Sequence, residues 1–277
     1  MSTHQIFISS YSKDFQFLRP NLLSLQKFCE GFLPPVVCVD EGDYGEAKRL
    51  LARTPVDVRL VVKNGRRGQG FMRAQIAMME CDLLSPDNAD FYYLVGSDCL
   101  AHRRFAPDIY FRDGKPVMLY NSRKYFEDAQ AGAPLAWIDS TSEILKFPVH
   151  GEFMRRLPIV YPRELFKPVR DHVEAVQGQP FEDYIYARNK AGGLVSESNI
   201  LGAFAWHRMP ELYKWMHADG NPEYLQYRFD EPDPIAQFWS HGGLNRPAET
   251  CAVVNGRSCA GRTPREVITE VLGPCWE

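Results

Sequence analysis

Uncharged apolar runs alternate with stretches of helical periodicity along the first 125 residues of the chain. The run from Phe91 to Val95 contains only aromatic and aliphatic residues, a pattern typical of a strand buried on both faces of a parallel sheet. Similar runs predict strands at residues 5–10, 36–39, 58–62 and 117–120. Strands that alternate with helices at this spacing form right-handed βαβ units, so the pattern predicts an α/β fold with a mostly parallel sheet flanked by helices.

Helical periodicity and capping signals predict where the helices lie. Ser196 is a candidate N-cap, which places Glu197 in the first turn of the next helix, where the helix dipole favours an anion. Residues 133–161 combine several prolines with aromatic residues, and this composition predicts a long irregular segment that forms a binding wall. The periodic stretches predict helices at residues 15–31, 46–53, 71–84, 162–176, 183–188, 197–206 and 264–272.

A Gly-rich basic loop at residues 64–70 precedes the helix at 71–84. It lacks the glycine spacing of a dinucleotide-binding turn and the G-K-[ST] of a P-loop, so it indicates a flexible turn. In this helix, Ala74 and Met78 belong to the predicted apolar face. Arg73 and Gln75 lie outside that face, near the N-terminal turn.

Composition favours one globular domain that spans residues 1–277. The chain is 45% hydrophobic and 24% charged, which is enough apolar material for a large core. Its seven cysteines include no C-x-x-C pair, and this usage favours buried free thiols in a reducing compartment. The N-terminus lacks signal-peptide character, and no apolar run approaches the roughly 20 residues that span a bilayer. These features predict a cytoplasmic protein without a membrane span.

Polar side chains follow the apolar strands at their carboxyl ends. The run at Phe91 ends in Gly96, Ser97 and Asp98, so a carboxylate stands where ligands bind in open α/β sheets. A lone Asp in this position is more often a turn former or a helix cap. Two other strands end in Ser9-Ser10-Tyr11 and in Asp40-Glu41.

The order of these motifs resembles the GT-A class of nucleotide-sugar glycosyltransferases, and within it a branch found in bacteria and bacteriophages. The resemblance covers residues 5–206 and also rests on the segment Ser196–Gly202, Ser-Glu-Ser-Asn-Ile-Leu-Gly. It implies a GT-A-like, Rossmann-like domain. Residues 1–125 would bind the nucleotide sugar, and residues 126–277 would form a loop-rich acceptor-binding half with a C-terminal helix.

The resemblance also implies roles for individual residues. In the family, a D-x-D motif ends the central strand, and its last carboxylate binds a Mn²⁺ or Mg²⁺ ion that bridges the donor diphosphate. Asp98 matches that carboxylate, whereas Gly96 replaces the first Asp, and His241 is implied as a second metal ligand. Glu197 is implied as the general base of an inverting transfer. Donor-binding roles are implied for Ser9, Ser10, Tyr11, Asp40, Glu41, Arg73, Gln75 and Ser97.

The resemblance therefore implies a metal-dependent hexosyl- or pentosyltransferase that moves a sugar from a nucleoside-diphosphate sugar to a hydroxyl acceptor. The acceptor is a glycan or a lipid-linked saccharide, with a hydroxymethylated DNA base as second choice. The pI near 6.2 argues against DNA as the acceptor, whereas the basic pairs Arg66-Arg67 and Arg155-Arg156 leave a DNA acceptor as an alternative.

Two other functions remain open. A non-catalytic nucleotide-sugar or glycan-binding protein is suggested by the glycine at position 96. A sugar nucleotidyltransferase would share the sheet, but it should carry a Gly-rich N-terminal signature with Arg and Lys, which residues 6–10 lack.

Overall fold

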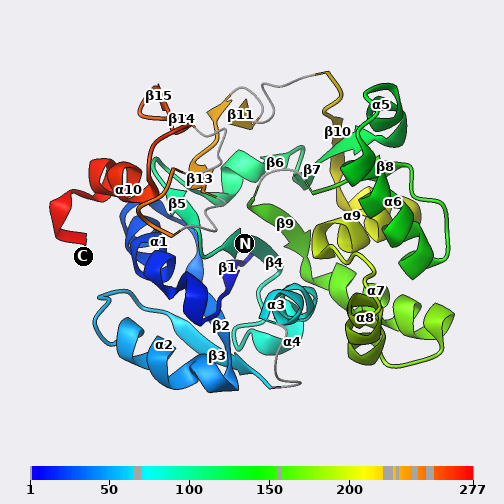
Figure 1. Cartoon of the computed structure of the whole chain (residues 1–277), viewed down its shortest axis with the longest axis horizontal. Coiled ribbons are helices and arrows are strands. Elements are labelled where there is room, and N and C mark those ends of the chain that lie inside the picture. The colour runs from blue at the N-terminus through cyan, green and yellow to red at the C-terminus, as the bar shows by residue number, and fades with distance from the viewer. Residues whose placement is uncertain are drawn as a thin grey trace.

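A mixed, mostly parallel five-stranded sheet lies at the centre of the structure, a computed structural model that describes residues 2–64, 70–154, 157–220, 227–228, 231–238, 243–247 and 253–276 (Figure 1). The strand order is β3-β2-β1-β4-β9, and only β9 runs antiparallel to its neighbour. These strands are β1 (His4–Ser9), β2 (Leu33–Asp40), β3 (Arg59–Lys63), β4 (Phe91–Gly96) and β9 (Ile159–Pro162). The predicted α/β class with a mostly parallel sheet is confirmed.

The strand register brings the polar strand ends to one edge of this sheet. Ser9 of β1 lies opposite Cys38 of β2 on one side and opposite Gly96 of β4 on the other. On β2, Asp40 lies opposite Lys63, the last residue of β3. Because these four strands are parallel, their carboxyl ends form a single edge.

Helices cover both faces of the sheet. On β1, Ile6 and Ile8 pack on the face covered by α1 (Phe15–Phe28) and α2 (Tyr44–Leu51), where Leu18 and Ala47 are buried. Phe7 points to the other face, among residues of α3 (Gly70–Met79), α6 (Gly132–Leu145), α7 (Arg163–Gln177), α8 (Phe181–Lys190) and α9 (Glu197–Arg208). This alternation explains why the strands carry uninterrupted apolar runs.

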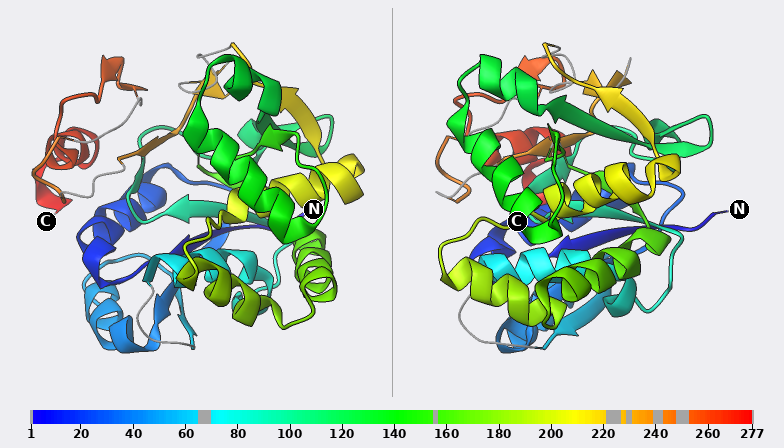
Figure 2. Two further views of the ribbon diagram at one scale, coloured as in Figure 1. Left: turned by 45° about the vertical axis from the view of Figure 1, so that its right-hand side comes forward. Right: turned by 90° about the vertical axis from the view of Figure 1, so that its right-hand side faces the viewer.

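A second, smaller sheet and the C-terminal segment complete the described fold. In the small sheet, β7 (Lys115–Ser122) pairs with β6 (Phe111–Arg112), β8 (Gly151–Glu152) and β10 (Lys214–His217). Helix α10 (Pro264–Leu272) packs beside α1, as Figures 1 and 2 show. The remaining elements are α4 (Cys81–Leu84), β5 (Cys99–Ala101), α5 (Arg123–Asp128), β11 (Tyr227–Arg228), β12 (Glu231–Pro232), β13 (Ile235–Gln237), β14 (Val253–Val254) and β15 (Arg257–Ser258).

The predicted N-cap of α9 is confirmed. The Ser196 hydroxyl accepts a hydrogen bond from the backbone N–H of Asn199, so α9 begins at Glu197. At the start of α10, Thr263 and Glu266 form a reciprocal capping box, with Pro264 in the first turn. Both helices therefore begin where the sequence indicates.

The prediction of an irregular segment over residues 133–161 is wrong. Helix α6 occupies residues 133–145 of it, and residues 132–208 are largely helical rather than loop-rich. Pro134 lies in the first turn of α6, where a backbone N–H needs no partner within the helix, so the proline is tolerated there. The helix ends at Lys146, which adopts a left-handed conformation with φ 56°.

The predicted helix at 71–84 forms, but it is interrupted and more deeply buried than its periodicity indicates. Helix α3 ends at Met79, and α4 begins at Cys81. Ala74 and Met78 are only half-buried, whereas Arg73 and Gln75 are buried. Helix α3 contacts β1, α8 and α9, so it is enclosed on several sides and has no single apolar face. None of the described helices combines the length and the hydropathy that a membrane crossing requires.

Candidate functional site

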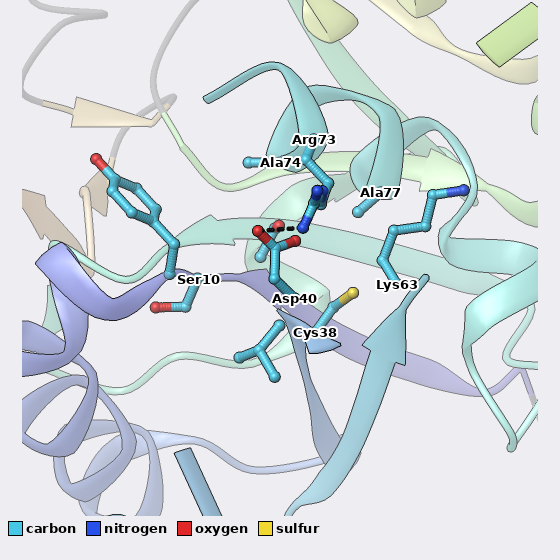
Figure 3. Close-up of a pocket in the computed structure, with 10 residues that line it drawn as sticks. Ser10, Cys38, Asp40, Lys63, Arg73, Ala74 and Ala77 are labelled. Atoms are coloured by element: carbon cyan, nitrogen blue, oxygen red, sulfur yellow. Dashed lines mark ion pairs between the residues drawn. The ribbon is translucent and has the colours of Figure 1, made fainter. Parts of the chain in front are cut away.

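A small pocket lies at the carboxyl edge of β1, β2 and β3, beneath α3. It brings together five residues to which the sequence assigned donor-binding roles, although they lie far apart along the chain. These residues are Ser9, Ser10, Tyr11, Asp40 and Arg73. Cys38, Val39, Lys63, Ala74 and Ala77 complete the lining (Figure 3).

Ser10 lines this pocket, and its hydroxyl is buried. Its backbone N–H donates to the carbonyl of Cys38 at 2.9 Å, which continues the β1–β2 ladder by one residue and fixes the position of the side chain. The side chain is 4% exposed, and its Oγ has no hydrogen-bond partner among the described residues. Because buried polar groups are nearly always satisfied, an unpaired hydroxyl in a pocket indicates a place for a polar ligand group.

Asp40 and Arg73 form an ion pair across the pocket, from the end of β2 to α3 (Figure 3). The Arg73 side chain is 7% exposed, so its charge depends on this carboxylate and on a hydrogen bond with Tyr186 of α8. Burial alone would lower the pKa of Arg73, but these two partners more than offset it and raise the pKa. The pair therefore ties α3 to the strand end.

Lys63 is a pocket residue that the sequence analysis missed. Its ammonium pairs with Glu80 at 2.6 Å and with Glu182 at 2.9 Å, and in Figure 3 it points away from Asp40. Burial lowers the pKa of Lys63, but its hydrogen bonds to Glu80 and Glu182 outweigh that effect and raise the pKa. The available signal was a lysine that ends a predicted strand at the same sheet edge as Asp40.

The charges of the pocket decide which part of a nucleotide fits it. The two cations, Lys63 and Arg73, are already matched by carboxylates. Among the described residues, the lining of the pocket thus has no positive surplus to attract a diphosphate. The hydroxyl of Ser10 has no hydrogen-bond partner among the described residues, and it suits an uncharged partner such as a ribose or a base.

Asp98 lies beside the pocket, in the turn that joins β4 to β5. Burial and the nearby charges of Asp14 and Asp98 raise the pKa of Tyr11, so the Asp98 carboxylate lies near Tyr11. A Cβ atom on Gly96 would lie 2.5 Å from Oδ1 of Asp98. The glycine at the first D-x-D position therefore leaves room for the Asp98 side chain in this orientation, and the neighbouring Ser97 is buried.

The part of the chain that the structure describes contains no cluster of three or more His, Cys, Asp or Glu side chains that could hold a metal ion. His241 lies outside the described residues. A single half-exposed carboxylate such as Asp98 fits the usual chemistry of Mg²⁺, which is often held by one or two carboxylates together with substrate phosphates. Glu41 is exposed at the start of a short 3₁₀ turn and does not line the pocket.

Glu197 forms a second, separate polar site at the N-terminus of α9. Its side chain is buried, and Oε1 accepts a hydrogen bond from Ser198 Oγ at 2.9 Å. The backbone N–H of Glu197 donates to Oε1 of Gln75 at 2.9 Å, so Gln75 lies at Glu197 and not in the pocket. Burial raises the pKa of Glu197, and the hydrogen bonds from Ser198 and Gln75 offset part of that rise. A raised pKa makes a carboxylate a better proton acceptor.

Comparison with models of known protein families gave no match, and comparison with curated protein sequences gave none either.

Proposed function

We propose that the protein is a metal-dependent glycosyltransferase with a GT-A-like domain that uses a nucleoside-diphosphate sugar. The observation that carries the proposal is the buried, unpaired hydroxyl of Ser10 in a pocket at the carboxyl edge of the parallel strands. Ligands of open α/β sheets bind at this edge. A nucleoside supplies ribose hydroxyls and base edges that can satisfy Ser10 and hydrogen-bond to Asp40.

The diphosphate then extends from the pocket towards Asp98, because the cations inside the pocket are already paired. Asp98, with His241 as second ligand, would hold a Mn²⁺ or Mg²⁺ ion beside the diphosphate. When bound, such an ion neutralises the negative charge that develops on the leaving diphosphate. Asp98 itself supplies a hard oxygen ligand of the type that these ions prefer.

Glu197 acts as the general base. The acceptor hydroxyl forms a bond to the anomeric carbon, and the bond from that carbon to the diphosphate oxygen breaks, with its electron pair passing to the diphosphate. The hydroxyl proton passes to the Glu197 carboxylate. Attack opposite the leaving group inverts the anomeric configuration. The raised pKa of Glu197, caused by its burial, supports this role. We propose a glycan or a lipid-linked saccharide as acceptor.

Calorimetric titration with uridine, guanosine, cytidine and thymidine diphosphates, with and without Mn²⁺, tests donor binding. Two serine variants separate binding from folding. Ser10→Ala removes a hydroxyl that has no partner among the described residues, so it should weaken nucleotide binding several-fold while leaving the melting temperature unchanged. Ser24→Ala removes a hydroxyl that donates to the Asn21 carbonyl and accepts from the Ala101 N–H. It should lower the melting temperature and leave nucleotide affinity unchanged.

Failure of all four diphosphates to bind, or equal affinity for wild type and Ser10→Ala, would refute the proposed donor site. If the nucleotides bind, the sugar nucleotide that contains the preferred base is incubated with the protein and saccharide acceptors. Release of nucleoside diphosphate with inversion supports the transferase. A tightly bound but intact sugar nucleotide identifies a binding protein instead.

A further inference from the structure

Helix α3 reaches both polar sites of the protein. Arg73 contributes to the pocket, where it pairs with Asp40. Gln75, two residues later, lies against Glu197 at the start of α9. Two residues correspond to about 200° around a helix, so these side chains leave α3 on opposite sides. One short helix thus spans the distance between the candidate donor pocket and the candidate base.

The contact between Gln75 and Glu197 is built from buried groups. Gln75 is 7% exposed and Glu197 is 6% exposed, although 122 positions separate them along the chain. The amide oxygen of Gln75 accepts the N–H of Glu197 at 2.9 Å, and its side chain also hydrogen-bonds the Glu197 carboxylate. A buried amide with both ends engaged holds its partner in one orientation.

We propose that Gln75 is a positioning residue that fixes the Glu197 carboxylate relative to the donor pocket. This inference rests on the proposed function and changes the role that the sequence assigned to Gln75, from donor contact to support of the base. Because α3 is anchored at Asp40 by Arg73, it sets the distance between the bound nucleoside and Glu197. Removal of the amide should therefore affect proton transfer and not donor affinity.

Among the described residues, ionisable groups near Glu197 or along α9 come from several elements. Tyr161 of β9 lies near Glu197, whose charge adds to the effect of burial in raising the pKa of Tyr161. On β8, which packs against α9, Glu152 is buried. On α7, His172 contacts Phe204, two turns further along α9. Among the described residues, Gln75 and Ser198 are the side chains that hydrogen-bond the Glu197 carboxylate.

Three variants test the proposal in the intact protein. Gln75→Met keeps the size of the side chain but removes its hydrogen bonds. Gln75→Glu keeps the shape and places a second carboxylate beside Glu197. Gln177→Met is the matched control, because the Gln177 amide donates to the carbonyls of Glu143 and Ile144 at 2.9 and 2.6 Å, in a contact between α7 and α6.

The first measurement is a ¹³C NMR titration of the side-chain carboxyl carbons in protein labelled at glutamate. The Glu197 signal is assigned by its absence in Glu197→Gln. In both Gln75 variants this signal should titrate at higher pH than in wild type, because a favourable hydrogen bond is lost or a like charge is added. In Gln177→Met it should titrate as in wild type. An unchanged titration in both Gln75 variants would overturn the proposal.

The second measurement is the pH profile of kcat. In Gln75→Met the acid limb should move to higher pH, and kcat at neutral pH should fall on the order of tenfold, as expected when one hydrogen bond to a charged group is lost. The affinity for the donor diphosphate should stay within about twofold of wild type, and a larger loss of donor affinity would return Gln75 to the donor site. If the wild type transfers no sugar, the proposed function fails, and the NMR titration alone decides the role of Gln75.

Discussion

The ion pair between Asp40 and Arg73 gives a prediction whose size follows from its burial. Asp40→Ala removes the carboxylate partner of a guanidinium whose side chain is 7% exposed. Removing one partner of a fully buried pair costs about 3–5 kcal/mol, because the other charge stays desolvated. The Asp40 side chain is 21% exposed, so solvent screens part of this effect, and we expect a loss of about 2–3 kcal/mol.

This loss corresponds to a measurable change in the melting temperature. Unfolding entropy is about 2.1 cal/mol/K per residue, so a chain of 277 residues has roughly 0.6 kcal/mol/K. A loss of about 2.5 kcal/mol should therefore lower the melting temperature by about 4 °C. The control Asp128→Ala breaks an exposed ion pair with Lys124, and its melting temperature should equal that of wild type.

A double-mutant cycle with Arg73→Met tests the physical reasoning. The double variant buries no unmatched guanidinium, so its destabilisation should be smaller than the sum of the two single losses by about 1–2 kcal/mol. Urea unfolding of the four proteins measures each free energy. Losses that add within about 0.5 kcal/mol would show that the pair is not coupled, and that Arg73 does not anchor α3 to β2.

Two further predictions concern α9. Burial raises the pKa of Glu197 above the usual 4.5, so the folded state binds this proton more tightly than the unfolded state, and the stability from this group falls as pH rises through the folded pKa. Glu197→Gln should thus melt at a higher temperature than wild type at about pH 8, and the two proteins should melt alike at about pH 4. A difference in melting temperature that does not depend on pH would contradict this prediction. Gly202→Ala would place a Cβ 2.5 Å from Cβ and Cγ of Phe153, and it should cost about 1–3 kcal/mol by urea unfolding. Gly132→Ala, which meets nothing within 4 Å, should be neutral, and equal stability of the two glycine variants would disprove this packing.

The parallel strands β1 to β4, strand β7 and most helix ends were predictable because their signals are local. The apolar run at residues 91–95 identifies the central strand, and Ser196 and Thr263 identify helix starts through their own side chains. Helix α6 was not predicted, because proline breaks a helix at most positions, whereas Pro134 occupies the tolerated first turn. The prediction was wrong because it did not consider where in the helix the proline would lie.

The contacts of the candidate site were less predictable, because they depend on which distant segments meet. Parallel strands bring Ser10, Asp40 and Lys63 to one edge, and this much follows from an α/β pattern once all strand ends are inspected. The partner of Gln75 lies 122 positions away, on a helix whose placement no local pattern specifies. The periodicity of the sequence predicted that Gln75 lies outside the buried face of α3. This was wrong because periodicity carries no information about α8 and α9, which pack on the helix in addition to the sheet.

The enclosure of α3 has a consequence for how this protein can diversify. A helix that packs against β1, α8 and α9 has little surface on which new side chains are tolerated, and its polar residues already have assigned partners. Variation that alters the choice of ligand is therefore expected at Tyr11, a half-exposed residue of the pocket, whereas variation at the exposed Glu41, which does not line the pocket, should be tolerated without that effect. A library randomised at these two positions should retain a much larger folded fraction than one randomised at positions 73 and 75.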